Sequence, residues 1–144
     1  MKPPPIPPDE RARLRTLWDY AVLDTEAEEA YDQTTALAAL ICEAPFSLIT
    51  LVDEDRQWFK SRHGWDVEQS DRAISFCAHA IHEPDLLLVP DAAEDDRFRG
   101  NPDVTGGPGI RFYAGAPLVS PEGHAVLSTA PSAPCRSSPS VRGS

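Results

Sequence analysis

The segment from Ser75 to Glu83 carries the side chains best suited to chemistry. Ser75 can cap a short helix, which would put Cys77 in the first turn, where the helix dipole lowers a thiol pKa and favours a reactive thiolate. His79 follows two residues later, about 200° around a helix, so the two side chains diverge and cannot readily share a ligand or a proton. The alternative is an inert, buried Cys77, because free cysteines are among the most buried residue types.

Metal binding has little support in the sequence. His79 and His82 share a helix face at a spacing that metal sites use, but no third ligand follows at a recognisable spacing. The turn Asp53-Glu54-Asp55 could bind a cation, yet calcium needs roughly six or more oxygens, and Arg56 beside the turn offsets its charge. We therefore predict no metal site, and the sequence names no cofactor.

The sequence also offers aromatic and polar side chains of the kinds that line small-molecule cavities. Such cavities have mainly apolar and aromatic walls with a few convergent polar groups. We predict that a ligand site, if present, draws on Trp58, Phe59, Cys77, His79, Arg111 and Tyr113.

A predicted hairpin from Pro45 to Arg62 positions these residues. Phe46 to Val52 is an apolar, β-branched run bounded by Pro45 and the acidic turn, as expected of a strand, and Gln57 to Arg62 forms its partner. Trp58 and Phe59 are adjacent and must face opposite sides of the sheet. A hairpin with an apolar side on each face needs helices to cover it.

Two helices are predicted before the hairpin. Asp9 can cap the first, whose apolar stripe contains Leu14, Leu17, Trp18 and Ala21. Thr25 and Glu28 have the spacing of a capping box that starts the second. Its predicted apolar face, packed flat on the sheet, consists of Ala27, Ala30, Tyr31, Thr34, Leu37, Ala38 and Ile41.

The chain after the hairpin alternates loops and short elements. Residues 63–72 read as a loop, and 76–83 as the short helix that Pro84 stops. Leu86 to Val89 is predicted to be a buried or interior strand, and 91–109 an irregular segment. Ile110 to Val119 alternates as a strand with Pro117 at an edge or bulge, and Ala125 to Leu127 begins a returning strand after a turn.

Length and charge limit the function classes. The 144 residues fit one domain, and residues 1–127 contain 11 basic and 23 acidic residues, a charge of −12 that repels nucleic acid and anionic lipid. No apolar run approaches the roughly twenty residues of a membrane span, and the first eight residues, five of them proline, lack the apolar core of a secretory signal. We expect a cytoplasmic protein with reduced thiols, because its three cysteines are odd in number and widely spaced.

The order of these elements, together with five separated blocks, resembles a GAF domain of the type that precedes bacterial sensor histidine kinases and diguanylate cyclases. The resemblance implies an α+β fold with a central antiparallel sheet, N-terminal helices on one face, and a ligand cavity between the other face and the loops. It also implies a sensory role in two-component or cyclic di-GMP signalling. The blocks that carry it are Tyr20 to Thr25, Leu48 to Ser61, Ser75 to Ile81, Val89 to Ala92 and Ile110 to Leu118.

The end of the chain departs from this family. Residues 128–144 contain three prolines and six serines, which cannot easily form a strand ladder or an apolar helical stripe. We therefore predict an extended arm at 1–8 that orders nothing, a GAF-like domain at 9–127, and a tail at 128–144 that is disordered from Pro131, so that the final strand and the C-terminal helix are missing or incomplete. A truncated or frame-shifted gene would also produce this ending.

Known chemistries of the family fit the sequence poorly. Bilin-binding members use a cysteine followed directly by histidine, whereas Ala78 separates Cys77 from His79, and the cyclic-nucleotide pattern is absent. Free methionine sulfoxide reductases use a cysteine pair, and neither Cys42 nor Cys135 pairs with Cys77 by spacing. We predict a non-catalytic sensory module without its output domain. Its predicted partners are a small-molecule ligand, a signalling kinase or cyclase and a second copy of the chain, but not nucleic acid or membrane; a thiol enzyme using Cys77 and an inactive remnant are the alternatives.

Overall fold

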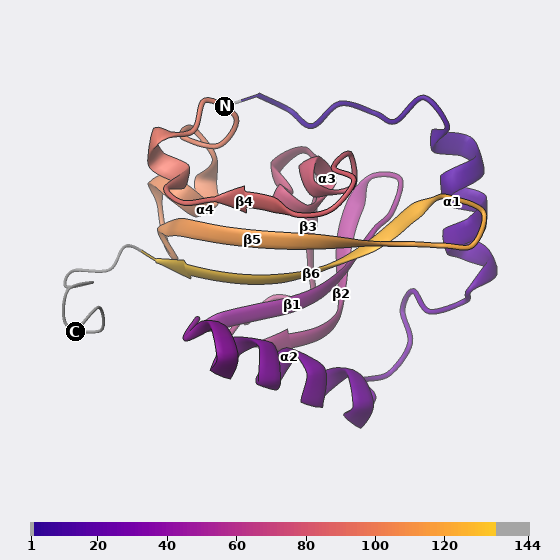
Figure 1. Ribbon diagram of the computed structural model, residues 1–144, viewed down its shortest axis with the longest axis horizontal. Helices are drawn as coiled ribbons and strands as arrows, with labels where there is room; N and C mark the ends of the chain where they lie inside the picture. The colour runs from indigo at the N-terminus through magenta and orange to yellow at the C-terminus, as the bar shows by residue number, and fades with distance from the viewer. Residues whose placement is uncertain (1, 135–144) are drawn as a thin grey trace.

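A six-stranded antiparallel sheet is the central element of the computed structural model, which describes residues 2–134 (Figure 1). The strands lie in the order β3-β2-β1-β6-β5-β4, and every neighbouring pair is antiparallel. This confirms the predicted α+β class with a central antiparallel sheet. The strands are β1 (Phe46–Val52), β2 (Arg56–His63), β3 (Gln69–Asp71), β4 (Leu87–Val89), β5 (Ile110–Val119) and β6 (Ala125–Pro134).

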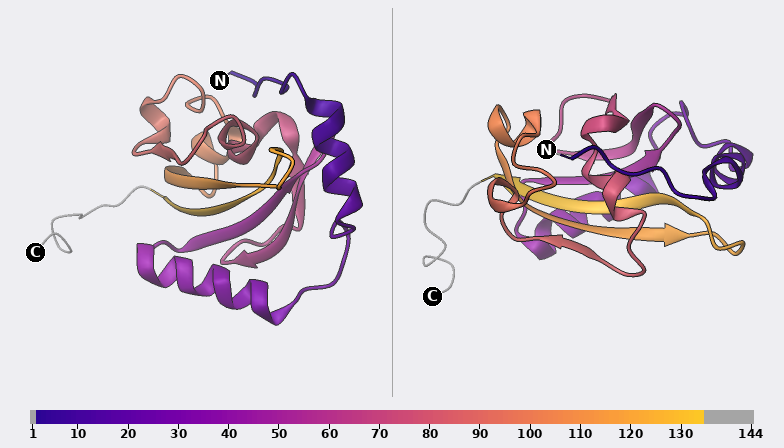
Figure 2. Two further views of the ribbon diagram at one scale, coloured as in Figure 1. Left: turned by 45° about the vertical axis from the view of Figure 1, so that its right-hand side comes forward. Right: turned by 90° about the horizontal axis from the view of Figure 1, so that it is seen from above.

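Helices cover both faces of this sheet and one end of it. The helix α2 lies on one face and α3 on the other, while α1 stands at the end where β6 begins (Figures 1 and 2). Helix α1 still packs Leu14 and Leu17 on Trp58, which faces the side opposite α3, so both N-terminal helices contact the face that they were predicted to cover. The helices are α1 (Glu10–Asp19), α2 (Glu29–Cys42), α3 (Phe76–Ala80) and α4 (Pro102–Thr105), with 3-10 turns at Arg72–Ile74 and Ala92–Glu94.

The hairpin of β1 and β2 forms as predicted. The Asp53 N–H donates to the Arg56 carbonyl at 2.8 Å and closes the turn. A β-bulge interrupts the ladder, because Ile49 pairs with Ser61 and Thr50 with Phe59, which leaves Lys60 as the extra residue.

Side chains alternate on the hairpin as expected. Trp58 packs with Leu14 and Leu17 of α1, whereas Phe59 faces the side that α3 covers, beside Cys77. Ser75 caps α3, since its Oγ accepts a hydrogen bond from the Ala78 N–H at 3.0 Å.

The helix α2 is rotated about its axis from the predicted orientation, so that Tyr31 and Ala38 of the predicted face are half-buried and its other members are exposed. Leu37, Leu40 and Ile41 are 55%, 75% and 71% exposed, whereas Thr35 and Ala39 are buried against the sheet. The Thr35 hydroxyl lies 2.8 Å from the Ser61 hydroxyl, which also donates to the Asp32 carboxylate. Ser61 makes the strand surface under α2 polar, so Thr35 and the small Ala39 pack there while Leu37, Leu40 and Ile41 face outward.

The predicted capping box at the start of α2 does not form. The helix begins one residue later than Glu28, and no side chain caps it. The Thr25 hydroxyl donates to the Val22 carbonyl and accepts from Lys60 Nζ at 2.7 Å instead. Lys60 also forms a 2.7 Å ion pair with Glu28, so this buried lysine holds the linker before α2. Asp9 likewise makes no side-chain cap on α1.

The final strand is longer than predicted. Residues 125–134 form β6, which lies in the middle of the sheet between β1 and β5, so the prediction of a missing or short strand after Leu127 is wrong. Pro131 pairs with Ser47 of β1, while the β5 ladder passes from Tyr113 opposite Ser132 to Ala116 opposite Thr129 and skips it. The proline thus falls where one ladder is interrupted, as strand prolines require. The predicted disorder of 135–144 lies outside the described residues.

Two further segments differ from expectation. The strand β4 is an edge strand rather than an interior one, and Leu88 is 52% exposed. The N-terminal arm from residue 2 to Pro8 is not a free leader, because it runs along α3 (Figure 1). Its Lys2 carbonyl accepts from His79 Nε2 at 3.3 Å and its Pro5 carbonyl accepts from His82 Nε2 at 2.8 Å. No helix in the described range 2–134 has the length and apolar character of a membrane span.

Candidate functional site

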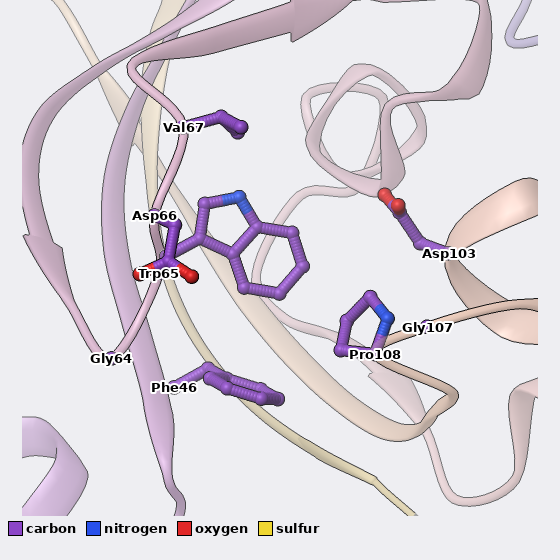
Figure 3. A pocket seen from close by; sticks show the side chains of 8 residues that line it. All are labelled: Phe46, Gly64, Trp65, Asp66, Val67, Asp103, Gly107 and Pro108. Carbon is purple, nitrogen blue, oxygen red and sulfur yellow. The ribbon is translucent and has the colours of Figure 1, made fainter.

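Two adjoining hollows lie between the sheet and the loops on the α3 side. The outer pocket, of about 460 Å³, is lined by Phe46, Gly64, Trp65, Asp66, Val67, Asp103, Gly107 and Pro108 (Figure 3). The inner cavity, of about 30 Å³, is lined by Leu48, Gln57, Phe59, Trp65, Phe76, Cys77, Asp103, Ile110, Tyr113 and Ser132. Trp65 and Asp103 line both, so they form the boundary between a ligand-sized pocket and a space for about one water molecule.

The backbone around Trp65 is fixed on both sides. Gly64 has φ 76°, a left-handed conformation, and a Cβ there would collide with the Pro45 carbonyl, so only glycine fits. Arg62 Nη1 donates to the Asp66 carbonyl at 2.9 Å. The Trp65 ring meets the Phe46 ring edge to face, with centroids 5.1 Å apart. The indole is therefore preorganised against the pocket, as Figure 3 shows.

Asp103 faces Trp65 from the other side of the pocket (Figure 3). Its N–H donates to Asn101 Oδ1 at 2.8 Å, and the buried Asn101 side chain donates to the Ile74 carbonyl at 2.8 Å. Burial raises the pKa of the Asp103 carboxyl. Among the described residues, no hydrogen bond or ion pair satisfies this half-buried carboxylate, which is an unusual arrangement for a protein acid.

The inner cavity contains a buried thiol. The Tyr113 hydroxyl donates to Cys77 Sγ at 3.1 Å, and both residues are buried. Burial raises the pKa of the Cys77 thiol, an effect larger than the lowering by the hydrogen bond from Tyr113. A thiol held protonated in this way is a poor nucleophile.

The comparison with protein families decides the class of the chain. The model of the GAF domain family matches residues 22–129, which include the whole hairpin, the outer pocket, all the lining of the inner cavity except Ser132, and the first half of β6. The chain belongs to the GAF domain family.

This GAF domain is similar to part of a curated protein and to solved structures of the same fold. It is 43% identical over 123 residues, 85% of the chain, to the cyclic di-GMP phosphodiesterase PA2567 of Pseudomonas aeruginosa strain PAO1, of which it spans 21%. The GAF domain of a phosphoenolpyruvate-protein phosphotransferase from Coxiella burnetii has a TM-score of 0.59 at 11% identity, with 85% of this chain and 76% of that chain covered. The free methionine-R-sulfoxide reductase of Neisseria meningitidis has a TM-score of 0.56 at 16% identity, covering 85% and 72%. At these identities the two structures show a shared fold alone.

The GAF domain brings three of the six predicted site residues together. Phe59, Cys77 and Tyr113 line the inner cavity. Whether they bind a ligand stays a prediction.

The other three predicted residues lie elsewhere. Trp58 lies across the sheet, beside a separate hollow of about 430 Å³ near Lys60. The His79 ring contacts the arm and, at a centroid distance of 4.9 Å, Phe98. Arg111 donates to the Val104 carbonyl at 2.9 Å and so braces α4. Alternation along a strand could not tell which face would be covered by which loop.

None of the eight residues that line the outer pocket was predicted as a site residue. Trp65 offered a signal, since an aromatic residue directly after glycine in a polar loop has no core of its own to enter. Asp103 offered none, because its neighbour Trp65 lies on a distant loop.

The acidic turn has a structural use in this GAF domain. Asp53 accepts from Trp18 Nε1 at 2.9 Å and from Arg56 Nε at 3.0 Å, which ties α1 to the hairpin. Burial would raise the pKa of the Asp53 carboxyl, but these bonds, with one from the Glu54 backbone, lower it overall. Within residues 2–134, no three His, Cys, Asp or Glu side chains are grouped as a metal would require.

Proposed function

We propose that this GAF domain is a non-catalytic, ligand-binding sensory module of a protein that controls cyclic di-GMP turnover. The observation that carries the proposal is the outer pocket beneath Trp65, which has the volume and the aromatic walls of a small-molecule site. The similarity to a cyclic di-GMP phosphodiesterase supports the signalling context. Because the chain spans 21% of that relative, the activity of the whole relative is a proposal here and not a property of this domain.

Ligand binding would act by shifting a population of loop positions. Trp65 lies on the loop that follows β2, and Asp103 lies on α4 just before β5, so a ligand that contacts both would fix the distance between two loops. Both loops continue directly into strands of the sheet. A change in their spacing would therefore alter the sheet and the elements that pack against it.

The competing proposal is a thiol enzyme, and the solved reductase folds are its support. The raised pKa of Cys77 speaks against it. Cys42 is exposed at the end of α2, on the opposite face of the sheet from α3, so it is badly placed to resolve a disulfide with Cys77 (Figure 2). We expect neither cyclic di-GMP hydrolysis nor methionine sulfoxide reduction by the purified chain. Cys77-dependent turnover in either assay would overturn this assignment.

The remaining predictions concern surroundings rather than the site. A cytoplasmic location, a signalling kinase or cyclase as output partner and a homodimer stay proposals. These proposals agree with the net charge of −10 and with membership of the GAF family. They are not implied by the fold, because one fold can serve many functions.

The pocket is tested by filling it. Val67 lines the pocket and is 49% exposed, and Val119, at the end of β5, is 54% exposed and lies outside it, so Val67→Trp and Val119→Trp are matched variants. A library of cellular metabolites is screened by thermal shift on the full chain. We expect compounds that raise the Tm of the wild type and of Val119→Trp but not of Val67→Trp. Equal shifts in all three proteins would contradict the proposed site.

A further inference from the structure

The lining of the outer pocket is acidic and aromatic, with no basic side chain. Its eight lining residues include the carboxylates of Asp66 and Asp103 and the rings of Phe46, Trp65 and Pro108, but no lysine, arginine or histidine. An anionic ligand such as a phosphate would meet only negative charge there. The rest of the chain adds to this repulsion of anions, because residues 1–127 carry 23 acidic and 11 basic side chains.

Asp103 has the properties of a charge that waits for a partner. It is half-buried, its pKa is raised by burial, and no described side chain or backbone group is bonded to its carboxylate. The bond from its N–H to Asn101 Oδ1 holds the backbone that carries this carboxylate beside the pocket. A cation in the pocket would recover the electrostatic energy that burial removes.

Trp65 offers the second half of a cation site. The negative face of an indole attracts ammonium and guanidinium groups within about 6 Å, and tryptophan is the strongest of the aromatic side chains in this role. Phe46 holds the ring in place by an edge-to-face contact at an interplanar angle of 83°. In Figure 3, the Trp65 ring and the Asp103 carboxylate lie on opposite sides of the pocket.

We propose that the outer pocket binds a small organic cation, an amine or quaternary ammonium, with its charge between the Asp103 carboxylate and the Trp65 ring. This inference rests on the proposed function and names the ligand class of the same site. It separates this GAF domain from members that bind nucleotides, because the lining of the pocket contains no basic side chain to pair with a phosphate.

Choline chloride is the probe, and 3,3-dimethyl-1-butanol is its uncharged counterpart of the same shape. Inorganic phosphate is the anionic comparison. Dissociation constants are measured on the full chain by NMR titration at physiological salt, followed on the backbone amides of Trp65 and Asp103. We expect choline to bind at least about tenfold more tightly than the neutral alcohol, as a cation–π contact with a paired charge implies, and phosphate not to bind.

Two matched variants assign the effect to one carboxylate. Asp103→Asn removes the charge without changing the shape, and Asp85→Asn removes an exposed charge outside the pocket. We expect choline affinity to fall about tenfold in the first and to stay unchanged in the second. The wild-type affinity should also fall as the pH drops through the raised pKa of Asp103. Asp66 is the other carboxylate in the pocket, and the Asp103→Asn protein, which keeps it, should lose most of that pH dependence.

The outcomes separate the two proposals. If the neutral alcohol or phosphate binds as well as choline, or if Asp103→Asn binds choline as the wild type does, the cation inference is wrong. If, in the same protein, metabolites still bind and Val67→Trp abolishes their binding, the proposed function survives that failure. If no compound of either set binds at this pocket, both proposals are wrong.

Discussion

The Tyr113 hydroxyl and the Cys77 sulfur form a hydrogen bond of 3.1 Å in the buried layer between the sheet and α3. This contact predicts contrasting reactivity for the two described cysteines. Cys42 is exposed and Cys77 is fully enclosed with a raised pKa. In a Cys135→Ser background, a thiol reagent at pH 8 should modify Cys42 quickly and Cys77 only when the protein unfolds. Fast modification of Cys77 in the folded protein would contradict its assignment as inert.

Tyr113→Phe tests the same contact energetically. The variant removes one hydrogen bond to a weak sulfur acceptor, so the free energy of unfolding should fall by about 1 kcal/mol or less. Urea denaturation measures the change. A loss of several kcal/mol would mean that the phenol does more than bond the thiol.

Gly115 should not tolerate a side chain. The Tyr113 ring lies over Gly115 on the same strand face, and a Cβ at position 115 would overlap the phenol ring. Gly115→Ala should therefore lower the free energy of unfolding by about 1–3 kcal/mol through overpacking. The penalty should shrink in a Tyr113→Leu background, where the ring is absent. Equal penalties in both backgrounds would place the strain elsewhere.

The main strands of the sheet were predictable because their pattern is local. The apolar run of β1, the span of β5 and the cap at Ser75 each depend on residues within one short segment, and each is confirmed. The predicted alternation within β5 is wrong, because the register shifts after Ile110 and the buried residues are then Tyr113 and Gly115. The extent of β6 was not predictable, because its serines and prolines form a strand only between β1 and β5. Pairing with a strand on each side outweighs the Ser- and Pro-rich composition of β6, which by itself would favour disorder.

The orientation of α2 and the pocket were beyond the sequence for a related reason. Leu37 and Ile41 marked the apolar side of the helix correctly, but the polar strand surface at Ser61 decides which side packs. Trp65 and Asp103 meet only through the fold. Sequence patterns report each element, whereas these features depend on what the neighbouring element presents.

The N-terminal arm should protect His79. Burial is the largest influence on the pKa of His79 and lowers it, and the charges of Arg97 and His82 lower it further. The Lys2 carbonyl and the Asp95 carboxylate act in the opposite direction but are outweighed. A histidine with a lowered folded pKa contributes stability that is present above about pH 6.5 and is lost as the pH falls through the folded pKa. Deleting residues 2–6 should expose the His79 ring and raise its pKa towards 6.5. The free energy of unfolding should then fall less steeply as the pH is lowered. NMR titration of the ring measures both proteins, and an unchanged pKa would show that the arm does not bury it.

Glu10 should be essential to the junction of α1 and the hairpin. Its carboxylate accepts from Arg13 Nε at 2.8 Å and from Arg72 Nη1 at 2.5 Å, and both arginines are buried. Burial would raise the pKa of Glu10, but the two arginines outweigh it and the pKa is lowered. Glu10→Gln should lower the free energy of unfolding by about 3 kcal/mol, because it leaves two buried cations unpaired. Asp19→Asn, an exposed change on the same helix, should have no such effect.

The same pair of proteins has a pH signature. A carboxyl with a lowered folded pKa contributes stability that is present above the unfolded pKa and is lost as the pH falls through the folded value. The difference between wild type and Glu10→Gln should therefore be constant above about pH 4.5 and shrink in more acid solution. A difference that persists unchanged to pH 2 would mean that charge is not what Glu10 contributes.

The tryptophans provide the most direct test of the sensory pocket, because each reports on a different region. Trp65 lines the outer pocket, and Trp58 lies beside the hollow near Lys60. Trp18, on α1, donates a hydrogen bond to Asp53 in the hairpin turn. In protein labelled with 5-fluorotryptophan, the fluorine spectrum is recorded with a compound that raises the Tm in the metabolite screen. We expect the Trp65 resonance to move on binding while the other two stay in place. A shift confined to Trp58 or Trp18 would contradict this expectation.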